Sequence, residues 1–317
     1  MTRAGATFLT GASGFTGRHL AARLRAAGHH VVGVDRAPPL LPGDVQADLL
    51  ASGVMRDLIA RVRPVRVYHL AGPVAEPRDE AGRKSALDAT VSMTLGLLEA
   101  LAGLGGRRRM LVTSSCATYG APSRADGRTT EQDPVAPVSF YGLSKAMQEL
   151  VALSFGRQSG VEVVVTRGYN LLGPGEGDRS VTGTVLAQLA AGSRRIRTGS
   201  VDTARDFLDV RDAAAAYEAV MEQGEAFAVY NVGSGRAVAV NDVIGQVLAQ
   251  WGGGCVLERD ESRLRRADVP CVFADNSRLL GLGWRPAHAL ADSVRDAVAA
   301  QREGRDQKSA VVGAERR

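Results

Sequence analysis

The chain has 317 residues, of which 45% are hydrophobic and 23% are charged. This composition excludes wholesale disorder, collagen-like repeats and a small disulfide-held fold, and the length suffices for one large domain or two modest ones. The net charge of +5 comes from 39 Lys and Arg against 34 Asp and Glu, spread along the chain. It indicates an arginine-rich solvated surface, and we expect no nucleic-acid partner.

Targeting and cysteine patterns add two expectations. The apolar run Ala6–Leu9 is too short for a signal-peptide core or a membrane span, and no run reaches about 18 apolar residues. The three cysteines, Cys116, Cys255 and Cys271, are odd in number and include no C-x-x-C pair. We therefore expect a reduced, cytoplasmic protein with no membrane partner and no metal site.

Apolar strands and helices alternate through the first half of the chain. The predicted strands cover residues 6–10, 30–34, 66–70, 110–114 and 161–166. The predicted helices cover residues 14–27, 50–62, 85–104 and 141–159. Continuous apolar strands between helices are typical of a parallel sheet covered on both faces. The sequence therefore predicts an α/β fold with a Rossmann-type doubly wound parallel sheet.

The pattern becomes irregular after Asn170. A glycine-rich loop at 173–177 precedes predicted helices at 181–191, 211–223 and 240–251. We expect one domain from residues 1–170, with segments at about 200–240 returning to it, and a smaller mixed α/β domain from 171–199 and 241–301. Residues 302–317 are polar and lack periodicity, so a frayed tail is expected there.

Three glycines between the first strand and the first helix predict a dinucleotide site. Gly11 permits a tight turn, Gly14 lets the backbone approach a pyrophosphate, and Gly17 lets the helix pack closely on the sheet. The N–H groups near Phe15 and Thr16 are expected to point at the phosphates from the helix N-terminus. This assigns dinucleotide binding to the 1–170 domain.

The residues after the second strand bear on the choice of dinucleotide. Asp35 follows Gly17 by 18 residues, and an acidic side chain there can hydrogen-bond the adenosine ribose hydroxyls, which favours NAD. The neighbouring Arg36 can instead hold a 2′-phosphate, so NADP stays open. Asp48 and its neighbour Leu49 are placed at the adenine edge, although Asp48 is equally typical of a loop or helix cap.

A tyrosine–lysine pair marks the candidate catalytic site. Tyr141 and Lys145 are four residues apart and share one helix face. An ammonium beside a phenol is expected to lower the phenol pKa toward neutrality, which suits proton transfer between a hydroxyl and a carbonyl. Ser114 and Ser115 end the fourth strand, where ligands bind in open α/β sheets, and either can hydrogen-bond the substrate oxygen.

These features together resemble the extended short-chain dehydrogenase/reductase family, in its nucleotide-sugar epimerase, dehydratase and reductase members. The resemblance runs from Thr10 to about Pro286, and it includes Leu70 and Ala71 in a segment that flanks the nicotinamide. Further matching stretches lie at 167–175, 205–212 and 230–235. The resemblance implies a nucleotide-diphosphate sugar as substrate. It also implies a homodimer formed through the helices at 85–104 and 141–159.

The resemblance also assigns site residues. It implies a catalytic trio of Ser115, Tyr141 and Lys145, with Ser115 preferred over Ser114 from its distance to the Tyr119–Gly120 pair. It further places three residues on the diphosphate of the sugar substrate: Asn170, Arg205 and Arg265. Arginine suits this role because it offers bidentate donors to phosphate. The alternatives are a structural ion pair for either arginine and a turn-forming role for Asn170.

Differences from the family pattern reduce the number of reactions that this chain is expected to catalyse. The 4,6-dehydratases carry a Glu where this chain has Ala117, and some an Asp where it has Cys116. Water elimination needs an acid and a base, and Ala117 supplies neither, so a dehydratase is disfavoured. The stretch 199–207 looks most like the GDP-4-keto-6-deoxymannose reductases. This chain also has Thr90 where the family has an Asn, and Arg266 where the reductases have a proline. These two differences leave open which residues contact the nicotinamide and which nucleotide the sugar carries.

The main hypothesis is a reductase of the 4-keto group of a nucleotide-linked 4-keto-6-deoxy sugar, with NADH or NADPH as the hydride source. The alternative is a nucleotide-sugar 4-epimerase that uses the same trio and retains its NAD. A third reading is a nucleotide-sensing regulatory protein on the same fold. The presence of both Tyr141 and Lys145 disfavours this third reading.

Overall fold

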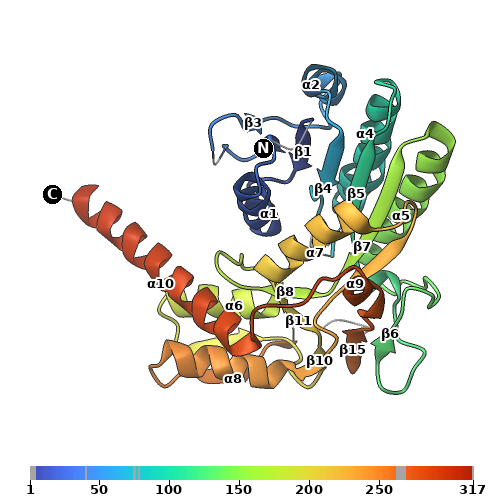
Figure 1. The fold of residues 1–317 in the computed structure, drawn as a ribbon. Helices are drawn as coiled ribbons and strands as arrows, with labels where there is room; N and C mark the ends of the chain where they lie inside the picture. The colour runs from blue at the N-terminus through green and yellow to red at the C-terminus, as the bar shows by residue number, and fades with distance from the viewer. Residues whose placement is uncertain (1–4, 40, 74–75, 78, 262–268, 316–317) are drawn as a thin grey trace.

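A seven-stranded parallel sheet forms the centre of the molecule. The computed structural model describes residues 5–39, 41–73, 76–77, 79–261 and 269–315 (Figure 1). The strands lie in the order β12-β7-β5-β4-β1-β2-β3, and adjacent strands are parallel. Their bounds are β1 Thr7–Thr10, β2 Val31–Asp35, β3 Val45–Gln46, β4 Arg66–His69, β5 Arg109–Ser115, β7 Glu162–Gly168 and β12 Val229–Val232. The predicted doubly wound sheet is confirmed, with the five predicted strands at its centre.

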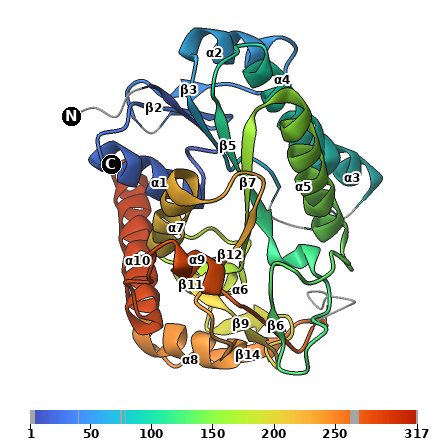
Figure 2. The same cartoon turned by 45° about the vertical axis from the view of Figure 1, so that its right-hand side comes forward.

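Helices cover both faces of this sheet (Figures 1 and 2). On one face α1 (Phe15–Ala26) packs against α7 (Val210–Gln223), and on the other lie α2 (Val54–Val62), α4 (Met93–Ala102) and α5 (Phe140–Ser159). Successive strand side chains enter opposite cores: Leu9 faces α1 and α7, whereas Phe8 faces α2 and α4. Because both faces are buried, the strands read as continuous apolar runs.

The helix predicted at 85–104 is interrupted. It consists of α3 (Glu80–Leu87), a π turn (Asp88–Ser92) and α4. At the π turn the Thr90 hydroxyl donates to the Ala86 carbonyl at 2.6 Å, and the Thr94 hydroxyl donates to the Thr90 carbonyl at 2.6 Å. Threonine hydroxyls that bond back into the helix compete with the regular backbone ladder, which accounts for the local widening.

This interrupted run has the composition of a membrane span. Among the described residues, the run Glu80–Ala102 alone is long and apolar enough to cross a membrane by those two criteria, and 39% of its apolar window is buried inside the molecule. Leu97 and Leu98, both 0% exposed, pack in the core beneath the sheet. The apolar character of α4 therefore has a structural cause in the packing of the fold.

A second, smaller apolar core lies outside the main sheet. Its helices are α6 (Val181–Ala190), α8 (Val240–Trp251) and α10 (Leu290–Glu315), whereas the short helix α9 (Ser277–Gly281) packs on the main core through Leu279. The remaining short strands are β6 Arg128–Thr129, β8 Asn170–Leu172, β9 Arg195–Thr198, β10 Ala204–Arg205, β11 Phe207–Asp209, β13 Val238–Ala239, β14 Val256–Arg259 and β15 Cys271–Ala274. They form a β13-β10-β15-β6 sheet and the pairs β11-β8 and β14-β9. Leu186, Val243 and Val294 join α6, α8 and α10 in one apolar cluster.

Residues 302–315, where the sequence pattern led us to expect a frayed tail, continue the last helix in the structure. Helix α10 continues to Glu315 and projects from the body of the molecule (Figure 1). Ala, Gln, Arg, Glu and Lys are intrinsically good helix formers, so a helix extends here without an apolar stripe. Arg302 also anchors it, because its guanidinium lies 5.2 Å from the ring centroid of Trp251 and donates to the Trp251 carbonyl.

Truncation of a core leucine tests this packing. Leu98 is 0% exposed in α4, and we expect Leu98→Ala to lower the free energy of unfolding by about 2–5 kcal/mol. Leu50, 42% exposed, provides the control, and Leu50→Ala should change it by no more than about 0.5 kcal/mol. Urea denaturation measures both. Equal effects of the two substitutions would contradict the assignment of α4 to the core.

Candidate active site

The site lies where the strand order of the sheet reverses. From β1 the chain moves to β2 and β3 on one side, and then crosses to β4 on the other. The chain connections that follow β1 and β4 therefore leave the carboxyl edge of the sheet in opposite directions. This edge is where open α/β sheets bind ligands. These loops touch: the Ala71 N–H donates to the Thr10 hydroxyl at 3.1 Å, and a Cβ on Gly11 would lie 2.9 Å from the Ala71 nitrogen.

The glycine loop is shaped for a dinucleotide diphosphate. Gly11 has φ +72°, and a Cβ on Gly17 would lie 1.9 Å from the Gly11 carbonyl oxygen, so a side chain is excluded there. Gly14 occupies the N-cap of α1, and no side chain from the described residues caps this helix. The N–H groups of Phe15 and Thr16 lie in the first turn of α1, so the positive end of the helix dipole is at the glycine loop. These residues fit a pyrophosphate group.

Asp35 lies beside this loop at the end of β2. Its Oδ2 accepts a hydrogen bond from the Ser13 N–H at 3.0 Å, and its Oδ1 accepts one from the Ala37 N–H at 3.1 Å. The neighbouring Arg36 is exposed. The structure thus brings a half-buried carboxylate and an exposed guanidinium to the same rim of the loop.

Asp48 and Leu49 occupy structural positions. The Asp48 Oδ1 accepts from the Leu50 N–H at 3.0 Å, which is the loop-cap alternative recognised in the sequence. The Leu49 side chain is 6% exposed and packs in the core with Phe8 and Val34. Contact of these two residues with an adenine ring stays a prediction.

The three expected catalytic side chains converge from β5 and α5. Ser115 ends β5, and its side chain lies near enough to the Tyr141 phenol to affect the pKa of that phenol. Tyr141 stands in the first turn of α5 because Ser139 caps this helix by accepting from the Gly142 N–H at 3.0 Å. Glu76, from the loop after β4, adds a second cap by accepting from the Tyr141 N–H at 2.9 Å. The sequence pattern gave no signal for Glu76.

Lys145 is 4% exposed on the same face of α5. Its ammonium donates to the Thr113 carbonyl at 2.9 Å and to the Gln148 Oε1 at 3.0 Å. Burial lowers the pKa of Lys145 to about 8, a shift that the Glu149 carboxylate partly opposes. The lysine therefore sits close to its own titration at neutral pH.

The expected effect of Lys145 on Tyr141 is wrong for this structure. Burial raises the pKa of Tyr141 to about 12, although the nearby Ser115 side chain opposes the rise. The phenol is not lowered toward neutrality because the two hydrogen bonds of the Lys145 ammonium go to Thr113 and Gln148, whereas desolvation acts directly on the phenol. Tyr141 is therefore protonated at neutral pH.

The neighbouring Ser114 hydrogen-bonds to a buried ion pair. The Ser114 hydroxyl donates to Glu149, whose carboxylate accepts from Arg167 at 2.7 Å and 3.0 Å. The Arg167 guanidinium also lies 4.5 Å from the ring centroid of Tyr119. All four side chains are less than one-tenth exposed. Ser114 thus points into a structural network, while Ser115 points to Tyr141.

The expected substrate residues lie on the second half of the chain. The Asn170 amide donates to the Asp206 carbonyl at 3.0 Å, and half-buried Arg205 donates to the Ala204 carbonyl at 2.8 Å. Arg265 lies outside the described residues. The loop at 173–175 packs on α1, where the His19 ring and the Pro174 carbonyl are 2.9 Å apart. This contact joins the substrate side to the glycine-loop helix.

Asp206 is a structural anchor that the sequence pattern did not reveal as such. It is 0% exposed and accepts from the N–H groups of Ser234, Gly235 and Ala274 at 2.7 to 3.1 Å. It thereby ties the segment that carries Arg205 to two others, the loop at 234–235 and strand β15. Among the residues that the structure describes, no group of three His, Cys, Asp or Glu side chains is arranged to hold a metal ion.

Comparison with known proteins identifies the family. The sequence pattern of the NAD dependent epimerase/dehydratase family matches residues 7–233. The chain belongs to this family. It is 35% identical to a GDP-6-deoxy-D-mannose reductase of Pseudomonas aeruginosa, covering 91% of this chain and 94% of that protein. It is 31% identical to a dTDP-6-deoxy-L-talose 4-dehydrogenase (NAD(P)(+)) of Kitasatospora kifunensis, covering 92% and 94%.

Two solved structures share the fold of this chain. RMD from Pseudomonas aeruginosa, complexed with NADPH, superposes with a TM-score of 0.83 at 31% identity, covering 95% of this chain and 99% of that one. MoeE5, in complex with UDP-glucuronic acid and NAD, superposes with a TM-score of 0.84 at 28% identity, covering 95% and 100%. The predicted enzyme class, an NAD(P)-dependent oxidoreductase of the extended short-chain type, is confirmed.

The buried lysine of this family member makes a testable contribution to stability. Below about pH 8, Lys145 is protonated in both the folded and the unfolded protein, and its burial destabilises the folded state. Between about pH 8 and the ordinary value of 10.5, the folded protein loses this proton first. The unfolded state then binds more protons, so the contribution of Lys145 to the free energy of unfolding rises with pH.

We therefore expect Lys145→Met to stabilise the protein relative to wild type at about pH 7.5, and this advantage to shrink by about pH 10. Urea denaturation at the two pH values measures the difference. Exposed Lys84 supplies the control, because Lys84→Met should show no such trend. A constant difference between wild type and Lys145→Met would contradict the assigned burial.

Proposed function

We propose that this protein reduces the 4-keto group of a nucleotide-linked 4-keto-6-deoxy sugar with a reduced nicotinamide dinucleotide. The observation that carries the proposal is the similarity, over 91% of this chain, to a relative named GDP-6-deoxy-D-mannose reductase. The protonated phenol of Tyr141 supports it as well, since a carbonyl that accepts hydride must also receive a proton.

Three side chains carry the chemistry in this proposal. Tyr141 donates its phenolic proton to the O4 oxygen of the sugar as the carbonyl becomes a hydroxyl. Ser115 hydrogen-bonds both that oxygen and the phenol. Lys145 orients the nicotinamide ribose. When bound, the reduced dinucleotide supplies the hydride.

The glycine loop and its neighbours are the proposed cofactor site. Gly11, Gly14, Phe15, Thr16 and Gly17 would hold the diphosphate, because their N–H groups open the positive end of α1. Leu70 and Ala71 would flank the nicotinamide, and Asp48 and Leu49 would line the adenine. Asp35 favours NAD through the ribose hydroxyls, whereas the exposed Arg36 offers a cation for the 2′-phosphate of NADP.

Asn170, Arg205 and Arg265 are the proposed contacts to the sugar diphosphate. Asp206 supports this role by holding the segment that carries Arg205 in place. The division of the chain follows: residues 1–170, with the returning segments at about 200–240, bind the dinucleotide, and residues 171–199 and 241–301 bind the sugar. The separate apolar cluster of α6, α8 and α10 supports this division. The odd number of cysteines and the lack of a C-x-x-C pair in the sequence support a cytoplasmic location.

A reductase assay tests the function. Purified protein is mixed with NADH or NADPH and with GDP-, dTDP- and UDP-linked 4-keto-6-deoxy sugars, and nicotinamide fluorescence is followed. We expect stoichiometric loss of the reduced dinucleotide with one sugar. Tyr141→Phe should abolish turnover while it leaves dinucleotide affinity within about twofold, because the phenol proton enters only the chemical step.

Two outcomes would overturn the reductase proposal. Turnover by Tyr141→Phe at the wild-type rate would show that Tyr141 is not the proton donor. No loss of reduced dinucleotide with any sugar, together with NAD released from the denatured protein, would favour the 4-epimerase. Two relatives named UDP-glucose 4-epimerase, at 28% and 30% identity to this chain, support that alternative.

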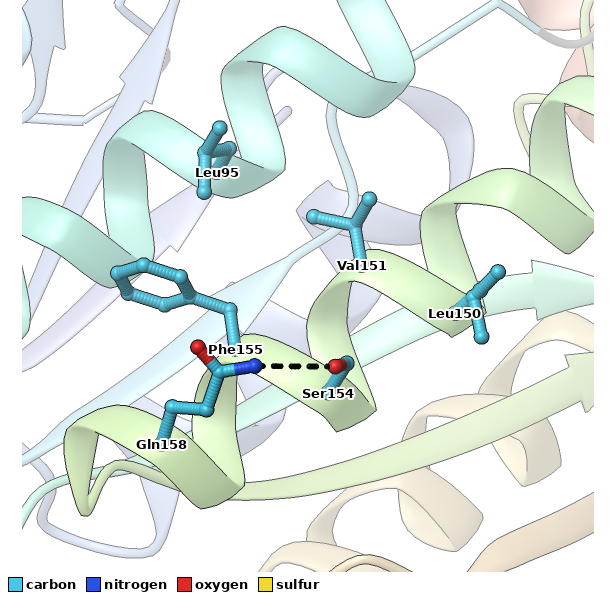
Figure 3. Close-up of a pocket in the computed structure, with 6 residues that line it drawn as sticks. All are labelled: Leu95, Leu150, Val151, Ser154, Phe155 and Gln158. Carbon is cyan, nitrogen blue, oxygen red and sulfur yellow. Dashed lines mark hydrogen bonds between the residues drawn. The ribbon is translucent and has the colours of Figure 1, made fainter.

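We also propose that the protein forms a homodimer through α4 and α5. Leu143, Met147 and Leu150 are 42%, 38% and 70% exposed, and their spacing of four and three residues places them on one face of α5. Beside Leu150, a shallow hollow between the two helices is lined by Leu95, Val151, Ser154, Phe155 and Gln158 (Figure 3). A second copy placed by a two-fold axis would cover this stripe with the same stripe.

A charge in the stripe tests the dimer. We expect Leu150→Glu to shift the protein to monomers, because two carboxylates would be buried against each other at the two-fold axis. Leu50→Glu, at another exposed leucine, should leave the dimer intact. Sedimentation velocity across a range of protein concentrations measures the state. A monomeric wild-type protein, or a dimeric Leu150→Glu variant, would contradict the proposal.

A further inference from the structure

A chain of buried hydrogen bonds runs from Lys145 to the loop after β1. The Lys145 ammonium donates to Gln148 Oε1 at 3.0 Å, and the Gln148 amide donates to the Thr94 hydroxyl at 2.9 Å. His69 Nε2 lies 3.0 Å from the same hydroxyl, and His69 Nδ1 lies 2.8 Å from the Thr10 hydroxyl. Thr10 immediately precedes Gly11, and all five side chains are at most 4% exposed.

The partners at each end determine which His69 nitrogen carries the proton. Thr94 donates its only hydroxyl proton to the Thr90 carbonyl at 2.6 Å, so it accepts from both Gln148 and His69. His69 Nε2 must therefore be the protonated nitrogen. At the other end, the Thr10 hydroxyl already accepts from the Ala71 N–H, and it donates to the unprotonated Nδ1. Every donor in the chain then has one acceptor.

Burial keeps the His69 ring neutral. The ring is 0% exposed, and desolvation, with the nearby Lys145 charge, lowers the pKa of His69 to about 3. The imidazole is therefore a fixed donor and acceptor at neutral pH. A neutral ring with one assigned proton gives the chain a single direction, from the Thr10 hydroxyl toward Thr94.

We propose that His69 is a positioning residue that, through Thr94 and Gln148, keeps Lys145 and the Thr10–Gly11 loop at one fixed spacing. This inference rests on the proposed function, in which Lys145 and that loop hold opposite ends of one dinucleotide. His69 belongs to β4, Thr94 to α4 and Gln148 to α5, so the chain joins three elements to the end of β1. Loss of one link frees Lys145 to move relative to the loop, which weakens dinucleotide binding.

The first measurement is nitrogen NMR of the wild-type protein, labelled with ¹⁵N at its five histidines and free of dinucleotide and sugar. His69→Leu assigns the resonance. We expect a neutral His69 ring with its proton on Nε2, unchanged between about pH 5 and pH 9. A ring protonated on Nδ1, or one that titrates in this range, would overturn the proposal.

The second measurement is the affinity for NADH and NADPH, from fluorescence titration of Thr94→Val. This isosteric change leaves the donors of His69 and Gln148 without their shared acceptor. We expect about 10- to 100-fold weaker binding, because dinucleotide binding must then restore the Lys145 position that these hydrogen bonds hold in the wild-type protein. The KM for the sugar should stay within about twofold. Thr94→Ser, which restores the hydroxyl, should return the affinity to near the wild-type value.

Thr7 provides the matched control. It is 0% exposed on β1, three residues before Thr10, and its hydroxyl has no hydrogen-bond partner within the described part of the chain. Thr7→Val should therefore leave dinucleotide affinity unchanged. A folded Thr94→Val protein that binds within about twofold of wild type would refute the positioning role. If Thr94→Val does not fold, Gln148→Met gives the same readout.

These readouts separate two kinds of failure. Neither the NMR spectrum nor the dinucleotide titration needs a sugar, so both stand if no sugar is reduced. If sugar reduction is observed and the Thr94→Val affinity is unchanged, the reductase proposal survives and the role of His69 does not.

Discussion

The contact between the loop after β1 and the loop after β4 constrains the rest of the site. A Cβ on Gly11 would lie 2.9 Å from the Ala71 nitrogen, and the Ala71 N–H is already held by Thr10. The two loops therefore have one mutual position, at the point where the strand order reverses. Helix α1 follows because its Gly17 packs on the Gly11 carbonyl. Helix α5 is fixed on β5 by the Lys145 ammonium, which donates to the Thr113 carbonyl.

Local sequence signals were sufficient to predict the main sheet, and they also suggested where the candidate site lies. Strands buried on both faces are continuously apolar, and glycines at 11, 14 and 17 are required by close backbone contacts, so both leave a readable pattern. The spacing of Tyr141 and Lys145 is equally local. The edge strand β3 has only two residues, which is too short for any periodicity to reveal.

Other parts of the site depend on contacts between distant segments. Glu76 caps α5 from a loop more than sixty residues away in sequence, and nothing near Glu76 indicates that partner. The distinction between Ser114 and Ser115 depends on Glu149 and Arg167, which meet only in the folded chain. The pKa of Tyr141 departs from expectation for the same reason, because desolvation is a property of the whole fold.

The π turn at Asp88–Ser92 sets the rotational phase of α4. One inserted residue turns the helix that follows by about 100°, the angle between successive residues of a regular helix. In the resulting phase, Thr94 faces His69 and Gln148, while Leu95 faces the hollow beside α5. A deletion that restored regular helix would turn both side chains away at once. The geometry of the candidate site and the proposed dimer surface therefore both depend on the rotational setting of this one helix.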